Sequence, residues 1–327
     1  MDLFYKLSLV PSSILGIFYL YKTYFAVPKY EGNEDLTGKV ILITGGSSGI
    51  GKELAYRLAM RQATLILGCR NINKCKESRQ KIFLKSNNKN VYCSELDLES
   101  YDSINGFVKR LSEKFDRVDI LINNAGYKGG KIREITGAFV EKQLAINFIG
   151  AHLLTKKLIS LLSASKGARV LYLICPQYKE GNINMSDINM IKEYDKYKAF
   201  NQSQLMRMLS MRHFAKKFPP SQISFNACDP GMVYTNFHNQ SSYNKNIISR
   251  LLFKYINTLI LRGAWQAPET PVMCCVSDEL NGVTGQLYRD LKPLEINENI
   301  LDPSSLAFID LLCDKWSNAP DPNLSVK

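Results

Sequence analysis

The sequence predicts a doubly wound α/β fold, with one parallel sheet in a single domain behind an N-terminal membrane anchor. From residue 40 onward, short apolar runs alternate with longer helical patterns, which is typical of a parallel sheet covered by helices on both faces. A glycine-rich turn joins the first run to the first helix, and an apolar segment precedes both. The 327 residues, 45% of them hydrophobic, are enough for one large core.

Residues 1–28 are the predicted anchor. Their apolar stretch, Leu7–Tyr21, approaches the length of a membrane span when residues 25–27 are added. No small-residue cleavage site follows it, which favours a retained anchor over a signal peptide. The alternative is an amphipathic helix lying on the surface. More lysines follow the segment than precede it, so the positive-inside rule favours a cytosolic domain.

A polar linker at residues 29–38 leads into a domain expected to occupy residues 39–327. Apolar runs predict strands at residues 40–43, 64–68, 91–96, 119–122, 168–174 and 223–228. Periodic patterns between them predict helices at residues 53–61, 73–85, 100–114, 139–162 and 200–217. Residues 261–327 are expected to pack on the same sheet and not to form a second domain.

Charge and cysteine content narrow the classes of partner. The net charge is +12, but the lysines and arginines are scattered and no nucleic-acid motif is present, so we expect solvated surface and no nucleic-acid partner. None of the eight cysteines forms a Cys-x-x-Cys pair, and no His or Cys cluster has metal-ligand spacing. The sequence therefore predicts no metal site, and reduced, mostly buried thiols in a cytosol-facing protein.

The glycine-rich turn, Thr44–Gly51, predicts a phosphate-binding loop. Its glycines allow the backbone to turn tightly and approach a pyrophosphate, and the following helix N-terminus supplies N–H donors. Further motifs follow the later strands: Asp97 after the third, Asn123-Asn124-Ala125-Gly126 after the fourth, and Pro230-Gly231-Met232-Val233 with Thr235 after the sixth.

Together these motifs resemble the short-chain dehydrogenase/reductase family, which has a Rossmann-type fold and a nicotinamide cofactor. The runs Leu67–Asn71 and Gly282–Tyr288 are similar to its retinol dehydrogenase-like branch in particular. The resemblance covers about residues 39–316. It implies a membrane-anchored oxidoreductase at the endoplasmic reticulum or a lipid droplet, with membrane lipid as a partner; protein partners are not predicted.

The resemblance implies cofactor-binding roles. Gly45, Gly49 and Gly51 would shape the phosphate loop, Asp97 would meet the adenine amino group, and the Pro230 motif would hold the nicotinamide. The residues expected to bind the cofactor are Thr44, Gly45, Ser47, Ser48, Gly49, Ile50, Gly51, Arg70, Asp97, Asn124, Ala125, Gly126, Pro230, Gly231, Val233 and Thr235.

Arg70 decides the predicted cofactor. The second strand ends at this arginine, with no acidic residue there to accept a ribose 2′-hydroxyl. A guanidinium at this place can pair with a 2′-phosphate, which favours NADP(H) over NAD(H). The alternative is a surface arginine on a loop.

Four catalytic positions of the family fall on Asn147, Cys175, Phe200 and Gln204. In the family an Asn, a Ser, a Tyr and a Lys stand there: the Tyr transfers the proton, the Lys lowers its pKa and binds the ribose, and the Ser orients the substrate oxygen. Here only the Asn is kept. Phenylalanine cannot exchange a proton, glutamine carries no positive charge, and a thiol is a weak donor, so we expect impaired catalysis with cofactor binding retained.

A second register is open, because Tyr194–Lys198 is a literal Tyr-x-x-x-Lys. The run Ala199–Leu205 instead keeps the Ala, Gln, Ser and Leu of the branch's Ala-Tyr-x-Gln-Ser-Lys-Leu pattern, and its interval to Pro230 needs no insertion. We therefore prefer the register that places Phe200 and Gln204 at the site.

Residues 246–265 have the spacing of an amphipathic helix. This region covers the substrate in the family, so a lipophilic small molecule such as a retinoid or steroid, contact with the bilayer, or simple core packing are all open. Three functions are weighed: an impaired homologue, an active oxidoreductase that recruits Tyr194, Tyr197 or Cys175 as proton donor, and a structural protein with an empty nucleotide site.

Overall fold

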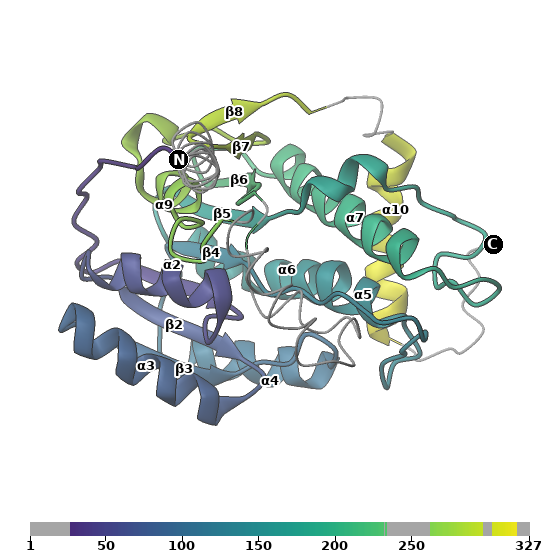
Figure 1. Ribbon diagram of the computed structural model, residues 1–327, viewed down its shortest axis with the longest axis horizontal. Helices are drawn as coiled ribbons and strands as arrows, with labels where there is room; N and C mark the ends of the chain where they lie inside the picture. The colour runs from purple at the N-terminus through teal and green to yellow at the C-terminus, as the bar shows by residue number, and fades with distance from the viewer. Residues whose placement is uncertain (1–26, 232, 234–261, 297–302, 319–327) are drawn as a thin grey trace, which may run out of the picture.

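The computed structural model describes residues 27–231, 233, 262–296 and 303–318 (Figure 1). Within them, one sheet has the strand order β3-β2-β1-β4-β5-β6-β7-β8. Its strands are β1 (Val40–Thr44), β2 (Thr64–Cys69), β3 (Val91–Glu95), β4 (Ile120–Asn123), β5 (Ala168–Leu173), β6 (Ile223–Cys228), β7 (Leu287–Arg289) and β8 (Lys292–Leu294).

The first seven strands are parallel, and β8 returns antiparallel to β7. Strand β1 lies between β2 and β4, with Leu42 paired to Ile66 on one side and to Leu121 on the other. Ile41, Leu42 and Ile43 are fully buried. A strand buried on both faces is apolar at every position, which is why its sequence is a continuous apolar run without alternation.

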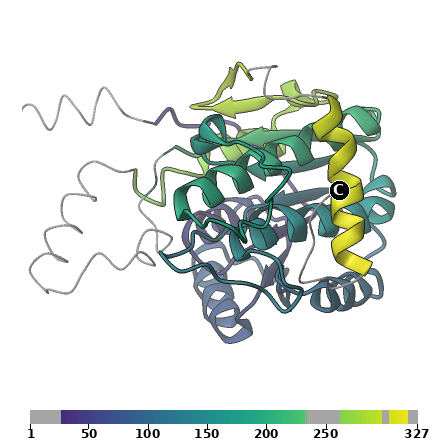
Figure 2. The same ribbon diagram turned by 90° about the vertical axis from the view of Figure 1, so that its right-hand side faces the viewer.

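Helices cover both faces of the sheet (Figure 1). One face carries α4 (Tyr101–Ser112), α6 (Ala151–Ser163), α7 (Lys196–Lys217) and α10 (Pro303–Asn318), and the other carries α2 (Gly49–Ala59), α3 (Ile72–Ser86) and α9 (Glu269–Val276). Figure 2 brings α10 to the viewer, where it lies against α7. The short elements are α5 (Lys142–Leu144), the π-helical turn η1 (Ala145–Gly150) and the 3₁₀ turns η2 (Pro176–Glu180) and η3 (Asp278–Leu280).

The predicted architecture is confirmed, with shifts at element ends. The helix expected at residues 139–162 begins at Lys142 and contains the π-helical turn. Helix α7 begins at Lys196, four residues before the predicted start, because the Asp195 side chain accepts hydrogen bonds from the backbone N–H groups of Tyr197 and Lys198. The C-terminal elements β7, β8, α9 and α10 join the same sheet and cores, as expected.

Most of the predicted anchor lies outside the described residues, as do residues 246–261. The linker packs on the domain: Tyr30 N–H donates to Glu269 Oε2 (2.9 Å), and Leu36 N–H donates to the Arg61 carbonyl (2.8 Å). One described helical stretch, Lys142–Ser163, is long and apolar enough to span a membrane, but 72% of it is buried, as in a core helix.

A disulfide joins Cys75 on α3 to Cys93 on β3, so the prediction of reduced thiols was wrong for this pair. The two lie 18 positions apart with no motif between them, and the return of the chain from α3 to β3 brings their Cα atoms to 5.9 Å. The other six cysteines are thiols: Cys69, Cys175, Cys228, Cys274, Cys275 and Cys313.

Candidate active site

A cavity of about 350 Å³ lies at the carboxyl ends of β1, β4, β5 and β6. The strand order reverses between β1 and β4, and ligands of doubly wound sheets bind in the crevice at such a point. The phosphate loop lines one end of this cavity, and the predicted catalytic positions line the other.

The phosphate loop folds over the start of α2. Gly45 has φ +69° and donates its N–H to the Gly68 carbonyl at 2.8 Å. A Cβ on Gly51 would lie 2.6 Å from the Gly45 carbonyl oxygen, so glycine is required there. The first turn of α2 reads Gly-Ile-Gly-Lys, which leaves N–H donors for an anion without a competing acid.

Thr44 and Asn124 lock this loop to the loop after β4. Thr44 Oγ1 accepts from the backbone N–H groups of Asn124 and Ala125, each at 3.0 Å, and Asn124 Nδ2 donates to the Thr44 carbonyl at 2.7 Å. The predicted residues that line the cavity at this end are Gly45, Ser48, Gly49, Ile50, Asn124, Ala125 and Gly126. Thr44, Ser47 and Gly51, also predicted to bind the cofactor, do not line the described cavity.

At the end of the cavity lined by the phosphate loop, Lys74 lines the cavity and Arg70 does not. Arg70 is 63% exposed, and its Nη1 pairs with Glu99 Oε1 at 2.7 Å. Asp97 is also absent from the described lining; its Oδ1 accepts from the Glu99 N–H at 3.0 Å. Lys74 was missed, although its place in the first turn after Arg70 was a usable signal.

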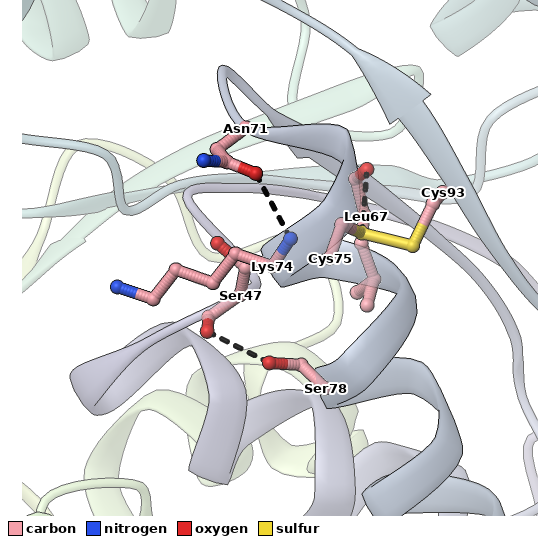
Figure 3. The surroundings of a disulfide bond; sticks show 7 residues. All are labelled: Ser47, Leu67, Asn71, Lys74, Cys75, Ser78 and Cys93. Carbon is pink, nitrogen blue, oxygen red and sulfur yellow. Dashed lines mark hydrogen bonds between the residues drawn. A yellow bond between two sulfur atoms is a disulfide. The ribbon is translucent and has the colours of Figure 1, made fainter.

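Helix α3 is tied to its neighbours where Lys74 lies (Figure 3). Asn71 caps the helix by accepting from Lys74 N–H at 2.9 Å. Ser78 Oγ donates to the Ser47 carbonyl of the phosphate loop at 2.8 Å, and the Cys75–Cys93 bond holds the helix to β3. These contacts fix the backbone that carries Lys74.

Pro230, Gly231 and Val233 line the cavity after β6, as predicted; Thr235 lies outside the described residues. Gly231 has φ +78°, and its N–H donates to Asp229 Oδ1 at 2.8 Å. Burial raises the pKa of the Asp229 carboxyl, while Arg289 Nη1 approaches it at 3.3 Å.

Three of the four predicted catalytic positions meet in the cavity: Cys175, Phe200 and Gln204. Phe200 is 2% exposed, and Gln204 follows one turn later on the same face of α7. Gln204 Oε1 accepts the Cys175 backbone N–H at 3.1 Å. The amide therefore fastens α7 to the end of β5.

Asn147 lies beside the cavity, outside its lining. It is fully buried in the π-helical turn, its Oδ1 accepts from Tyr127 N–H (2.6 Å), and its Nδ2 donates to the Tyr127 carbonyl (2.8 Å) and to Ser203 Oγ (2.9 Å). In this arrangement Asn147 holds the loop after β4 against α7.

The phenols of the alternative register do not line the cavity in the described chain. The Tyr194 hydroxyl accepts from Gln143 Nε2 at 3.2 Å. Burial, followed by the nearby Glu141 charge, raises the Tyr194 pKa to about 12. Tyr197 is 49% exposed.

Two cations at the catalytic end were missed by sequence reasoning: Lys128 and Arg207. Arg207 is buried on α7 and donates to the carbonyls of Ala125 (2.7 Å) and Asn123; burial lowers its pKa to about 10. Burial, aided by the Asp229 charge, raises the Cys175 pKa to about 11, against the opposing effect of both cations. The thiol is therefore protonated and neutral at physiological pH.

Known proteins share this framework. Residues 39–246 match the short chain dehydrogenase family. Human retinol dehydrogenase 13 is 30% identical over 281 residues, covering 86% of this chain and 85% of the relative. Retinol dehydrogenase 12 of Mus musculus is 30% identical over 290 residues, covering 88% and 90%. A short chain dehydrogenase of Escherichia coli CFT073, crystallised with NADPH, superposes with a TM-score of 0.63 at 19% identity, covering 80% of this chain and 100% of that one, and shares the fold.

Proposed function

Because the chain belongs to the short-chain dehydrogenase family, we propose that it is a membrane-anchored, NADP(H)-binding, retinol dehydrogenase-like protein whose proton transfer is impaired. The meeting of Phe200, Gln204 and Cys175 in one cavity carries the proposal. The preferred register places these residues where the family has its Tyr, Lys and Ser. Resemblance to the retinol dehydrogenases supports an endoplasmic reticulum or lipid-droplet membrane as the site of the anchor.

The residues at the phosphate end fit a dinucleotide phosphate. Gly45, Ser48 and Gly49 line the cavity where α2 begins, so the N–H groups of its first turn are available to a pyrophosphate. Lys74 offers a cation to a 2′-phosphate, which supports NADP(H) over NAD(H). When bound, the nicotinamide would supply or accept a hydride; the chain's own task at this end is to hold and orient it.

The residues at the catalytic end can contact a ligand, but they include no fast proton donor. The Phe200 ring has no exchangeable proton, and the Gln204 side-chain oxygen already accepts a hydrogen bond from the Cys175 N–H. Cys175 carries the titratable thiol at this place, but its raised pKa and weak S–H donor make it a slow acid. An active oxidoreductase using Cys175 is the second candidate, because Cys175 lies in the cavity whereas Tyr194 and Tyr197 do not line it.

The test follows NADPH binding and NADPH oxidation by the full-length chain, with retinaldehyde and a steroid ketone as acceptors. We expect NADPH to bind and its oxidation to stay at the rate without enzyme. The triple variant Cys175→Ser/Phe200→Tyr/Gln204→Lys should raise the rate at least tenfold, while Phe218→Tyr, at the C-terminal end of α7 away from the cavity, should leave it unchanged.

Turnover by the unmodified chain would overturn the impairment, and Cys175→Ser would then test the second candidate. Failure of NADPH to bind would overturn the cofactor assignment and favour a structural protein. A folded, NADPH-binding triple variant without activity would contradict the register.

A further inference from the structure

The charges that line the cavity are unbalanced. Three cations line it, Lys74, Lys128 and Arg207, and no carboxylate does so among the residues the structure describes. The proposed 2′-phosphate accounts for Lys74, and two backbone carbonyls engage Arg207. Lys128 has neither explanation.

Lys128 lies on the loop after β4, half-buried at the catalytic end. Its Nζ lies 5.0 Å from the centroid of the Phe200 ring and 5.8 Å from that of Tyr197. Within the described ranges, no carboxylate oxygen lies within 4 Å of this ammonium. An aromatic face attracts a cation but leaves its N–H donors without an acceptor.

No carboxylate lines the cavity beside Lys128 in the described part of the chain, and Asp229, whose charge reaches Cys175, pairs with Arg289 Nη1 at 3.3 Å. Cys175 is held as a neutral thiol, Gln204 is a neutral amide, and Arg207 adds a second positive charge. Leu173, Ile174 and Pro176 give the adjoining wall an apolar surface. A neutral alcohol or aldehyde would not neutralise the positive charge of Lys128 and Arg207. A carboxylate would pair with the Lys128 ammonium and place its apolar part against the apolar wall.

We infer that the catalytic end of the cavity binds an apolar carboxylate, with Lys128 as the residue that determines this specificity. The inference rests on the proposed function, in which a cofactor occupies the phosphate end of the same cavity. A carboxylate carbon is a poor hydride acceptor, so the anion is a ligand that this site holds and does not convert. That behaviour matches a site with neither the family Tyr nor the family Lys.

A competing role for Lys128 is to contact the ribose of the nicotinamide, replacing the cation absent at Gln204. The two roles predict different losses of affinity when the Lys128 charge is removed. If Lys128 binds a carboxylate, the affinity for the carboxylate falls and the affinity for NADPH stays. If Lys128 contacts the ribose, the affinity for NADPH falls.

The experiment compares 4-phenylbutyrate with its neutral analogue 4-phenylbutanamide. Calorimetric titrations use the full-length chain in lipid nanodiscs, without NADPH, and NADPH is titrated separately. The variants are Lys128→Met, Lys128→Arg and, as a matched control, Lys131→Met, which removes an exposed lysine of the same loop outside the cavity.

We expect the unmodified chain to bind the carboxylate at least tenfold more tightly than the amide. Lys128→Met should abolish this preference and leave amide and NADPH affinities within twofold, while Lys128→Arg and Lys131→Met should keep the preference. Equal affinity for both probes, or loss of NADPH in place of the carboxylate in Lys128→Met, would overturn the inference. Because the probes are titrated without NADPH, a failure to bind NADPH counts against the proposed function alone.

Discussion

The two ends of the cavity are built by different parts of the chain. At the phosphate end, Lys74 is the one charged side chain in the described lining, and the rest is built from backbone: a glycine with positive φ, the first turn of α2, and a loop held by Thr44 and Asn124. At the catalytic end, the contacts come from the side chains of Phe200, Gln204 and Cys175, to which the preferred register assigns the family's catalytic positions. Under the proposed function, a binding site made of backbone is kept while the side chains that perform the reaction differ.

Disrupting the backbone of the phosphate end should have the largest effect on cofactor binding. Gly51→Ala would place a Cβ 2.6 Å from the Gly45 carbonyl oxygen, and backbone atoms cannot give way cheaply. We expect NADPH affinity to fall by about two orders of magnitude or more, equivalent to about 2.7 kcal/mol, measured by fluorescence titration. Gly130→Ala, which meets no atom within 4 Å, is the control; an intact Gly51→Ala site would refute the backbone argument.

A second test concerns the support behind the phosphate end. The Cys75–Cys93 bond closes a loop with a sequence separation of 18. Closing such a loop lowers the conformational entropy of the unfolded chain and so stabilises the folded protein by about 3 kcal/mol. We expect dithiothreitol to lower the free energy of unfolding in urea by about this amount. Cys93→Ser should be equally less stable and insensitive to the reductant. If dithiothreitol leaves the free energy of unfolding of the unmodified chain unchanged, the disulfide is contradicted.

Titration of Cys175 sharpens the account of the catalytic end. A thiol with an ordinary pKa near 8.5 is mostly thiolate at pH 9.5, whereas the Cys175 pKa of about 11 keeps it largely protonated. Alkylation by iodoacetamide at pH 9.5 should therefore be roughly 30-fold slower than for an unperturbed thiol, followed by mass spectrometry of the Cys175 peptide. Because the folded pKa is raised, the stability it contributes is present below pH ~8.5 and is lost as pH rises toward about 11. Alkylation at the ordinary rate would contradict this burial effect.

The smallest expected effect separates the two candidate readers of a 2′-phosphate. Lys74 lines the cavity, whereas Arg70 is exposed and paired with Glu99. Lys74→Ala should weaken NADPH binding by about tenfold, or about 1.4 kcal/mol, and leave NADH unchanged. Arg70→Ala should have less effect on the same titrations. A larger loss in Arg70→Ala would restore the role that the sequence predicted for it.

Patterns that depend on the chain's local spacing were predicted well. Strand β1 was recognised because burial on both faces makes Ile41–Ile43 apolar at every position. The glycine loop was recognised because its geometry requires glycine at fixed intervals. Both constraints act on residues that are close together in the sequence, so both features could be recognised without knowing how the chain packs.

Features that depend on side-chain direction were predicted less well. Arg70 was expected at the cofactor, but its guanidinium turns to Glu99, which lies 29 positions away. Asn147 stays a predicted catalytic position, and its hydrogen bonds to Tyr127 and Ser203 could not be read from the sequence. Lys128 was overlooked because only the packing of its loop against α7 brings it to Phe200. Such pairings are set by the folded chain and have no short-range signature.

The disulfide makes the attachment of helix α3, which carries Lys74, depend on the redox potential of the compartment around the protein. The glutathione pool of the cytosol keeps most protein thiols reduced, whereas the lumen of the secretory pathway lets disulfides persist. In an oxidising compartment, the helix that carries Lys74 would be covalently fastened to β3; in a reducing one, it would be held by the Ser78–Ser47 hydrogen bond and by the packing of Cys75 and Ile82 in the core. The redox state of the compartment around the domain thereby sets how rigidly the backbone that carries Lys74 is held.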